Sequence, residues 1–287
     1  MQAWQADTVS RAAVRLLPFL YSASQESPGI VTPPMEEALE RLRSWDYTCP
    51  TGVDAFYRQE PPSEEEIANS VAASIFHAWL HRVLPATFQD EYHGFGLEPP
   101  DTDMLTRALI FLLEHPEQAR TGQRLFDDIS TQGYVETPGE ILLKSLEGAL
   151  GFLGRFFGSE NMDEWQWGRL HQSSLVLGYE DLSIPLFPVQ GPFPKSGGNF
   201  TVDASDPGGS PSSFNNTYGP NTRFVIEMEP GVLRAVNAQP GGQSEDPEGP
   251  HYGDLTERWL DNRYHELYFW LDDVLAHTET YLRFEPR

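Results

Sequence analysis

Apolar side chains recur every three or four residues through most of the first half of the chain, a spacing that predicts amphipathic helices. The first run follows Asp7-Thr8, and its apolar positions are Val9, Ala13, Leu16, Leu17 and Leu20. Pro18 falls near the end of this run, so the first predicted helix stops close to it.

A second helix is predicted to begin at a capping box. Ser63 and Glu66 have the spacing at which each side chain accepts a hydrogen bond from the backbone N–H of the other residue. The apolar positions that follow are Ile67, Val71, Ile75, Trp79 and Val83. Pro85 is predicted to close this segment, because proline lacks the N–H that a helix interior needs.

Two more helices have start signals of their own. Asp101 opens a shorter one, whose apolar positions are Leu105, Leu109 and Leu112. The Thr-Pro-Gly-Glu sequence at 137–140 combines an N-cap, a proline at the first helical position and a capping glutamate. This helix is predicted to run to about Phe157, where Gly158 can adopt the left-handed conformation that ends a helix.

Beyond Gly158 the pattern changes to short alternating runs in a sequence rich in Gly, Pro, Ser and Asn, most densely at 191–221. Runs with strand character lie at 200–204, 223–228 and 233–238, and Glu229-Pro230-Gly231 is a suitable hairpin turn between the last two. A final amphipathic segment is expected from Asp272 to about Leu282. Helices first and strands second indicate an α+β fold with a mainly helical part at 1–158 and a strand- and loop-rich part at 159–287. We expect both parts to complete one core, as one continuous domain.

Charge excludes one class of partner. The 287 residues carry a formal net charge of −24, whereas nucleic-acid binding needs a basic face. Lys144 and Lys195 are the only lysines, which leaves 19 − 2 = 17 arginines. An acidic surface with so little lysine indicates a host with a salty cytoplasm, and the alternative is an acidic protein from an arginine-biased genome.

Other compositional features leave the compartment open. Cys49 is the only cysteine, so the sequence has no internal disulfide framework and no thiolate metal cluster. No apolar run reaches the length of a transmembrane helix, so no membrane span is expected. The first residues, Met-Gln-Ala-Trp-Gln-Ala-Asp, lack the basic and apolar regions of a signal peptide.

Several residue patterns suggest chemistry, and each has a structural alternative. His77 and His81 lie four apart on a predicted helix, the spacing of two zinc ligands on one helical face, but Ala78 stands where a zinc protease needs its glutamate. We therefore interpret them as a solvated or core-edge pair. The adjacent carboxylates Asp127-Asp128 and Asp272-Asp273 are interpreted as surface charge, since neighbours on a helix diverge in direction.

Serine-based sites are equally weak. The sequence Gly242-Gln-Ser244-Glu-Asp246 lacks the last glycine of a nucleophile elbow. Ser173 is close to His171 in sequence, but that spacing does not orient an imidazole toward a hydroxyl. Two glycosylation sequons, at Asn199 and Asn215, have meaning only in an exported protein. The Gly-rich turns lack the lysine of a phosphate-binding loop, so no cofactor site is predicted.

A series of motifs spans nearly the whole chain in a fixed order. They are Met1 to Ser10 with Ala13, Leu42-Arg-Ser-Trp45-Asp46, the helix at 137–158, Trp165-Gln-Trp167-Gly-Arg-Leu-His171, Gly197-Gly-Asn-Phe-Thr-Val202, Arg223-Phe-Val225, Pro240 to Trp259, and Tyr264, Leu267 and Phe269. Together they resemble the closing third of the penicillin acylase (penicillin amidase) family of N-terminal-nucleophile hydrolases.

This resemblance implies a four-layer αββα sandwich built from two chains that are cut from one precursor. Its chemistry depends on a serine at the N-terminus of the β-chain, whose α-amino group acts as base, and on an oxyanion hole that includes an asparagine side chain. None of these parts transfers onto this sequence, because position 1 is Met and removing it would expose Gln2. We therefore expect no catalytic, cofactor or metal residue here, and a chain that is the C-terminal part of an acylase β-chain. Self-cleavage before Ser159 or Ser210 is the remaining route to an N-terminal serine.

The family's aromatic motifs are expected to be scaffold. Trp165, Trp167 and a neutral, hydrogen-bonded His171 should lock the junction between helices and sheet, and His251, Tyr252 and Trp259 should hold the long loop against the body.

Two functions remain open at this stage. The first is a segment of an amidohydrolase that requires an upstream partner carrying the serine, acting on N-acyl amides such as penicillins or acyl-homoserine lactones. The second is a stand-alone, non-catalytic binding or assembly protein derived from an acylase. Members of the family are often exported or periplasmic, but the compartment of this chain stays open.

Overall fold

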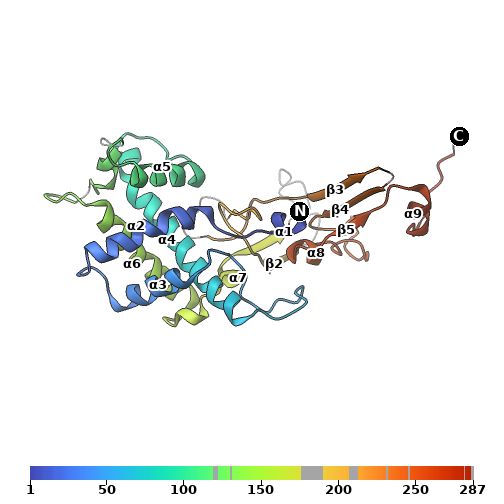
Figure 1. Cartoon of the computed structure of the whole chain (residues 1–287), viewed down its shortest axis with the longest axis horizontal. Coiled ribbons are helices and arrows are strands. Elements are labelled where there is room, and N and C mark those ends of the chain that lie inside the picture. The colour runs from blue at the N-terminus through green and yellow to red at the C-terminus, as the bar shows by residue number, and fades with distance from the viewer. Residues whose placement is uncertain are drawn as a thin grey trace. The chain divides into compact units, whose positions relative to one another are not determined.

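The computed structural model divides the chain into two compact units (Figure 1). It describes residues 1–118, 122–129, 131–175, 190–206, 213–230, 232–244, 246–280 and 282–285. The larger unit is Ala6–Pro220, and the smaller combines Met1–Gln5 with Asn221–Arg287. The larger unit is mainly helical and the smaller one combines an antiparallel sheet with short helices, which confirms the predicted α+β class. The boundary drawn at 158/159 falls inside the larger unit, and the single continuous domain stays a prediction.

Helix α4 (Glu64–Gly94) is the centre of the larger unit. It contacts α3 (Pro33–Ser44), α5 (Thr102–Glu114), the 3-10 turn η1 (Gly122–Phe126) and α6 (Pro138–Phe157), while α2 (Arg11–Glu26) packs on α5 and α6. Figure 1 shows these helices grouped around α4. The indole N–H of Trp79 on α4 donates to the carbonyl of Leu142 on α6, at 3.0 Å. Because α4 is surrounded, most of its side chains from Asn69 to Phe88 are buried, and it lacks a distinct polar face.

The predicted helix starts are confirmed. Ser63 and Glu66 form the capping box of α4, and Thr137 and Glu140 form that of α6. Asp101 accepts the backbone N–H of Met104 and caps α5. Gly158 ends α6 with a φ of 66°, in the left-handed region that glycine adopts without strain.

Two prolines were expected to end helices and do not. Pro18 lies inside α2, which continues to Glu26, and Pro85 lies inside α4, which continues to Gly94. Each proline lies on the less buried side of its helix, so the ring does not disturb the core. The packing of the surrounding turns outweighs the one backbone hydrogen bond that each proline removes.

Short elements follow α6 in the larger unit. They are the 3-10 turn η2 (Met162–Glu164), α7 (Trp167–Leu170), β1 (Gln172–Leu175) and β2 (Gln190–Pro194), and β1 pairs antiparallel with β2. The prediction of a strand at 200–204 is wrong. Thr201 Oγ1 instead hydrogen-bonds the backbone of Gly198 and Asp203, which folds this segment into a turn with a single bridge between Gly198 and Ala204.

The smaller unit contains a three-stranded antiparallel sheet in the order β3-β4-β5. Strand β3 (Arg223–Glu229) pairs with β4 (Val232–Ala238), which confirms the predicted hairpin, although Gly231 lies outside the described residues. Strand β5 (His265–Leu267) was not predicted. Helices α1 (Gln2–Gln5), α8 (Thr256–Leu260) and α9 (Leu271–Ala276) complete the unit.

Helix α9 is shorter than the segment expected from Asp272 to about Leu282. It ends at Ala276, and none of its side chains is buried. Short helices are unstable without a packed face, so the amphipathic pattern alone does not extend it.

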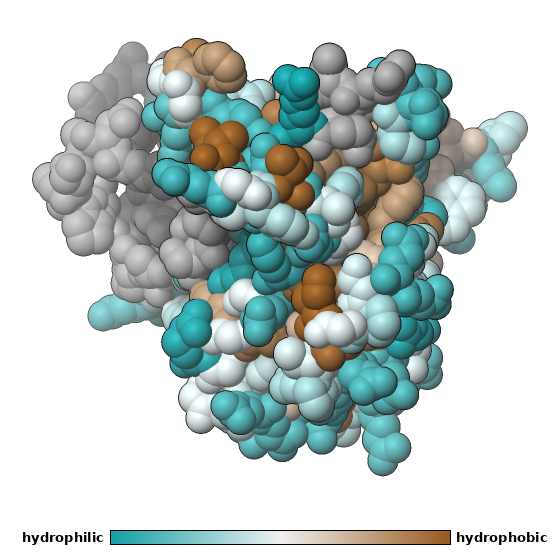
Figure 2. Space-filling model, turned by 90° about the vertical axis from the view of Figure 1, so that its left-hand side faces the viewer, coloured by the Kyte–Doolittle hydropathy of each residue, from teal (hydrophilic) through white to brown (hydrophobic). Residues whose placement is uncertain are grey.

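The face seen in Figure 2 is mostly hydrophilic, with scattered apolar side chains, as on an ordinary water-facing surface. Across the described part of the chain, the structure contains no helix with the length and apolar character needed to cross a membrane.

Candidate functional site

The Trp-x-Trp-Gly-x-x-His motif forms a buried aromatic stack in the larger unit. The ring of Trp167 lies between the rings of His77 and His171, with centroid distances of 4.5 Å on each side and interplanar angles of 18° and 12°. All three side chains are fully buried. The indole N–H of Trp167 donates to the carbonyl of Gly197 at 2.8 Å, so the stack joins α4, α7 and the loop that contains Gly197 and Gly198.

Two glycines allow this close approach. A Cβ on Gly168 would lie 2.8 Å from the Thr51 Cβ, and one on Gly198 would lie 2.8 Å from the His77 ring. Both distances are shorter than packed atoms tolerate, so each motif glycine permits a backbone contact that any larger residue would prevent.

His171 is held by two hydrogen bonds. Its Nδ1 lies 2.5 Å from the carbonyl oxygen of Phe214, and its Nε2 lies 2.8 Å from Ser205 Oγ. Because a carbonyl only accepts, Nδ1 carries the proton, and Nε2 accepts the hydroxyl hydrogen of Ser205. Burial lowers the pKa of His171 to about 3, despite the hydrogen bond to Phe214, so the ring is neutral at pH 7. The expectation of a neutral, hydrogen-bonded His171 is confirmed.

The His171–Ser205 pair has the contacts of a base and a nucleophile, but not the access. Ser205 is fully buried, and the group that orients the imidazole is a backbone carbonyl instead of a carboxylate. Ser173, the serine nearest to His171 in sequence, accepts a hydrogen bond from Asn216 at 3.3 Å instead. Sequence reasoning missed Ser205 because it lies 34 positions from His171, on a loop without a recognisable motif.

A buried ion pair lies beside the stack. Lys195 Nζ is 2.9 Å from the Asp203 carboxylate, and both side chains are fully buried. The backbone N–H of Lys195 donates to the carbonyl of His171 at 3.1 Å. Removing either charge would leave the other unpaired in the interior, which costs about 3–5 kcal/mol in comparable proteins. No sequence pattern indicates this pair, apart from the rarity of lysine.

The two helical histidines are more buried than expected. His77 is 0% exposed and His81 5%, so the interpretation of a solvated or core-edge pair is wrong. Burial lowers the pKa of His77 well below its usual value and that of His81 to about 4. Cys49 Sγ lies 3.7 Å from His77 Nε2, and burial raises the pKa of this thiol above its usual value. Within the described residues, no group of three or more His, Cys, Asp or Glu side chains is placed to hold a metal ion.

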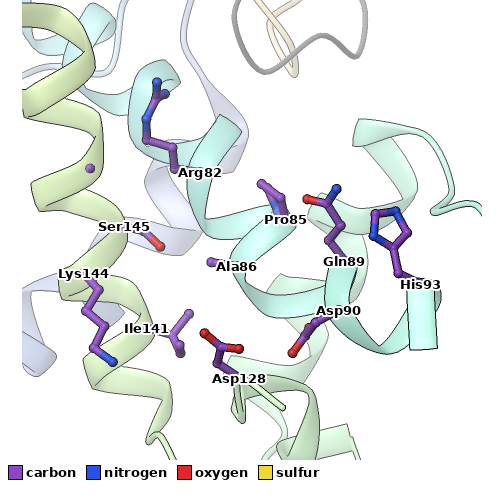
Figure 3. A pocket seen from close by; sticks show the side chains of 11 residues that line it. Arg82, Pro85, Ala86, Gln89, Asp90, His93, Asp128, Ile141, Lys144 and Ser145 are labelled. Atoms are coloured by element: carbon purple, nitrogen blue, oxygen red, sulfur yellow. The ribbon is translucent and has the colours of Figure 1, made fainter. Parts of the chain in front are cut away.

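A hollow lined in part by Asp128 lies between α4 and α6. It has a volume of about 470 Å³, and Asp90, Asp128, Lys144 and Ser145 are among its lining residues. Figure 3 shows the Asp128 carboxylate and the Ser145 hydroxyl directed into it. Lys144 is paired with the Glu136 carboxylate at 3.1 Å. The lining mixes both signs of charge around an open depression and holds no base–nucleophile pair. Asp272 and Asp273 belong to the smaller unit, where they are exposed in the first turn of α9.

The 240–259 block of the smaller unit folds onto itself. Tyr252 and Trp259 are buried, and the backbone N–H of Leu255 donates to the carbonyl of Gly241 at 3.0 Å. Arg223 donates to the carbonyl of Trp259 at 3.1 Å, and its guanidinium lies 5.6 Å from that ring. These contacts hold the loop, as expected for both aromatic residues.

His251 differs from the other motif histidine. Its ring is partly exposed and binds Asp254 through Nδ1 at 2.9 Å and Glu279 through Nε2 at 3.1 Å. The hydrogen bonds to Asp254 and Glu279 raise its pKa above the usual value. His251 therefore joins surface loops through contacts that favour its charged form, whereas His171 is neutral in the core.

Two of the remaining serine candidates accept hydrogen bonds from nearby backbone N–H groups. Ser159 Oγ accepts the backbone N–H of Asn161, and Ser244 Oγ accepts that of Asp246. Ser210 lies outside the described residues. Of the sequon asparagines, Asn199 is buried and Asn215 is exposed.

Comparisons with known proteins agree with these motifs. The sequence profile of the penicillin amidase family matches residues 1–276. The chain is 30% identical over 220 residues to the acyl-homoserine lactone acylase QuiP of Pseudomonas aeruginosa, and the alignment covers 69% of this chain and 24% of that protein. It is 27% identical over 207 residues to QuiP of Pseudomonas putida, with the same coverage of 69% and 24%. The chain thus spans about a quarter of the length of these curated relatives.

A solved structure of a penicillin acylase is similar to this chain in fold. A thermostable penicillin G acylase from Alcaligenes faecalis matches with a TM-score of 0.50 at 16% identity, covering 98% of this chain and 48% of that one. At this identity the likeness concerns the fold alone.

Proposed function

The chain belongs to the penicillin amidase family, and we propose that it is the C-terminal scaffold portion of an acylase that hydrolyses N-acyl amide bonds. The nucleophilic serine of that acylase is on its upstream portion, outside these 287 residues. The chain alone is inactive, and the two portions together form the active enzyme. The relatives named acyl-homoserine lactone acylases make N-acyl-homoserine lactones the first substrates to test.

The buried state of the His171–Ser205 pair carries this proposal. In this pair, a histidine imidazole is hydrogen-bonded to a serine hydroxyl, as a base and a nucleophile would be. Ser205 has no exposed surface, so an acyl group from solvent cannot reach its hydroxyl. A hydroxyl can act as a nucleophile only where the substrate carbonyl can approach to about 3 Å. The pair therefore supports a structural role for the chain.

In the complete enzyme the N-terminal serine hydroxyl attacks the acyl carbon, and the free α-amino group accepts its proton. That proton passes to the departing amine, and water then hydrolyses the acyl-serine ester to release the carboxylic acid. The role of this chain is to keep the sheet that carries the serine rigid. It does so through the His77–Trp167–His171 stack and the Lys195–Asp203 pair.

Reconstitution tests this function. The purified chain, the upstream portion and their mixture are assayed on a panel of chromogenic acyl amides and acyl-homoserine lactones, in low and high salt. We expect hydrolysis by the mixture alone. Hydrolysis by this chain without the upstream portion would contradict the proposal. A folded, monodisperse chain with no effect on the upstream portion would favour a non-catalytic binding protein.

A further inference from the structure

The hollow between α4 and α6 brings polar groups of three segments together. Asp90 lies on α4, Ser145 on α6, and Asp128 on the segment that follows η1. Figure 3 shows the Asp128 carboxylate and the Ser145 hydroxyl directed into the hollow, with the hydroxyl apart from both carboxylates. Pro85 and Ile141 contribute apolar surface to the same lining. The hollow therefore suits a small molecule with polar groups at both ends of an apolar body.

The Ser145 hydroxyl is a buried polar group without a partner among the described residues. Ser145 is 6% exposed, and no described residue forms a hydrogen bond with its Oγ. A helical serine can donate to the carbonyl four residues earlier, but this hydroxyl does not. Buried polar groups are nearly always hydrogen-bonded, so this one is an exception that needs a reason. Because the hydroxyl is directed into the hollow, a ligand there can supply its partner.

The arginine and the lysine of the lining are engaged by groups that do not line the hollow. Lys144 pairs with the Glu136 carboxylate at 3.1 Å. Arg82 donates to the carbonyl of Ala78 at 2.9 Å, and its guanidinium lies 4.2 Å from the centroid of the Phe152 ring. An anionic ligand would have to compete with these contacts, so the lining does not favour an anion.

The acidic groups, in contrast, leave negative charge unmatched. Asp90 Oδ2 accepts the backbone N–H of Ile129 at 2.9 Å, whereas its Oδ1 is buried without a hydrogen-bond partner in the described part of the chain. Burial and the neighbouring Asp90 carboxylate raise the pKa of Glu91 to about 8, as expected where carboxyl groups crowd together. A positively charged group in the hollow would relieve this repulsion, so its charge favours a cation.

We propose that this hollow binds a small organic amine in its ammonium form, with a hydroxyl group at the far end of a short apolar body. The ammonium group donates to the carboxylates of Asp90 and Asp128, and the ligand hydroxyl pairs with that of Ser145. The apolar body lies against Pro85 and Ile141. An organic cation is favoured over a bare metal ion, because no group of three or more described acidic, histidine or cysteine side chains is placed to hold one. The site is independent of the serine chemistry proposed for the acylase.

Three matched probes test the chemistry of the ligand. Tyramine has both the ammonium and the hydroxyl group, phenethylamine lacks the hydroxyl, and tyrosol lacks the ammonium. Their dissociation constants for this chain are measured by NMR titration at neutral pH. A constant, high concentration of potassium chloride screens the general attraction of a cation to a chain with net charge −24. Tyramine should bind about tenfold more tightly than tyrosol and about threefold more tightly than phenethylamine.

Variants of the lining test the place of binding. Asp128→Asn should weaken tyramine binding about tenfold and leave tyrosol binding unchanged. Ser145→Ala should remove the advantage of tyramine over phenethylamine, and it should fold because it only deletes an unpartnered hydroxyl from a helix. Ser74→Ala is the matched control, since the Ser74 hydroxyl on α4 is also buried without a described partner but does not line the hollow. Asp103→Asn, on the exposed first turn of α5, is the control for charge. Both controls should bind all three probes as the wild type does.

Several results would overturn the inference. The absence of saturable tyramine binding would do so, as would equal affinities for tyramine and tyrosol. Tyramine binding that the control variants weaken as much as Asp128→Asn and Ser145→Ala do would place the amine elsewhere. Displacement of tyramine by magnesium chloride, but not by potassium chloride of equal ionic strength, would identify an inorganic cation as the occupant. None of these results bears on the amide hydrolysis of the reconstituted acylase, so the proposed function stands or fails separately.

Discussion

At the scale of single residues, burial and neighbours shift the pKa values of the two motif histidines in opposite directions. His171 accepts and donates hydrogen bonds in the core, where burial keeps it neutral. His251 binds two carboxylates at the surface, and those hydrogen bonds favour its charged form. The same residue type therefore stabilises a core junction in one motif and a loop contact in the other.

Replacing His171 should cost far more stability than replacing His251. His171→Ala strands the Ser205 hydroxyl and the Phe214 carbonyl and leaves a cavity beside Trp167, so we expect a loss of about 3–5 kcal/mol in unfolding free energy. His251→Ala should lower it far less, since the contacts of His251 are largely solvated. Urea unfolding measures both, and equal losses would refute the structural role of His171.

The buried histidines should also make stability depend on pH. The pKa values of His171 and His81 are lowered to about 3 and about 4, so the unfolded chain binds their protons at a higher pH than the native state does. The stability that depends on these two neutral histidines is therefore fully present above about pH 6.5 and is lost as pH decreases toward 4, by up to about 1.4 kcal/mol per pH unit for each histidine. Urea unfolding at several pH values should show a shallower slope for His171→Ala. An unchanged slope would show that His171 does not carry this linkage.

At the scale of elements, sequence information was sufficient where the interaction is local. The capping boxes at Ser63 and Thr137 and the stop at Gly158 depend on residues within one helical turn, and the structure has them as predicted. The hairpin of β3 and β4 is local as well.

Contacts between residues far apart in the chain could not be predicted from the sequence. The His171–Ser205 and His77–Trp167 contacts join segments 34 and 90 residues apart, and no periodic pattern indicates them. The short strands β1, β2 and β5 owe their conformation to their partners more than to their composition. Pro18 and Pro85 were misjudged for a related reason, since tertiary packing outweighs a local signal.

Pro85 offers a direct test of that balance. In the interior of α4 it removes a backbone hydrogen bond, so Pro85→Ala should stabilise the protein by about 1–3 kcal/mol. Pro138 occupies the first position of α6, where no such bond is lost, and Pro138→Ala should be neutral or slightly destabilising. Thermal unfolding compares the two. If Pro85→Ala destabilises the protein as much as Pro138→Ala does, α4 is not continuous through this site.

At the scale of the whole molecule, the acidic charge should make stability depend on salt. A net charge of −24 disfavours the compact state through self-repulsion, which added salt screens. We expect the urea midpoint to rise as KCl increases from about 0.05 to about 1 M at pH 7.5. The rise should shrink near the isoelectric point of about 4.5. A midpoint independent of salt at pH 7.5 would favour an arginine-biased genome over adaptation to a salty cytoplasm.

Locating the nucleophile tests the central claim most directly. The reconstituted mixture of this chain and the upstream portion is treated with a serine-directed sulfonyl fluoride, and the labelled peptide is identified by mass spectrometry. The account predicts loss of activity with one label, on the N-terminal serine of the upstream portion, and no label on this chain. A stoichiometric label on Ser159, Ser173, Ser205 or Ser210 that abolishes activity would place the catalytic serine within these residues and contradict the account.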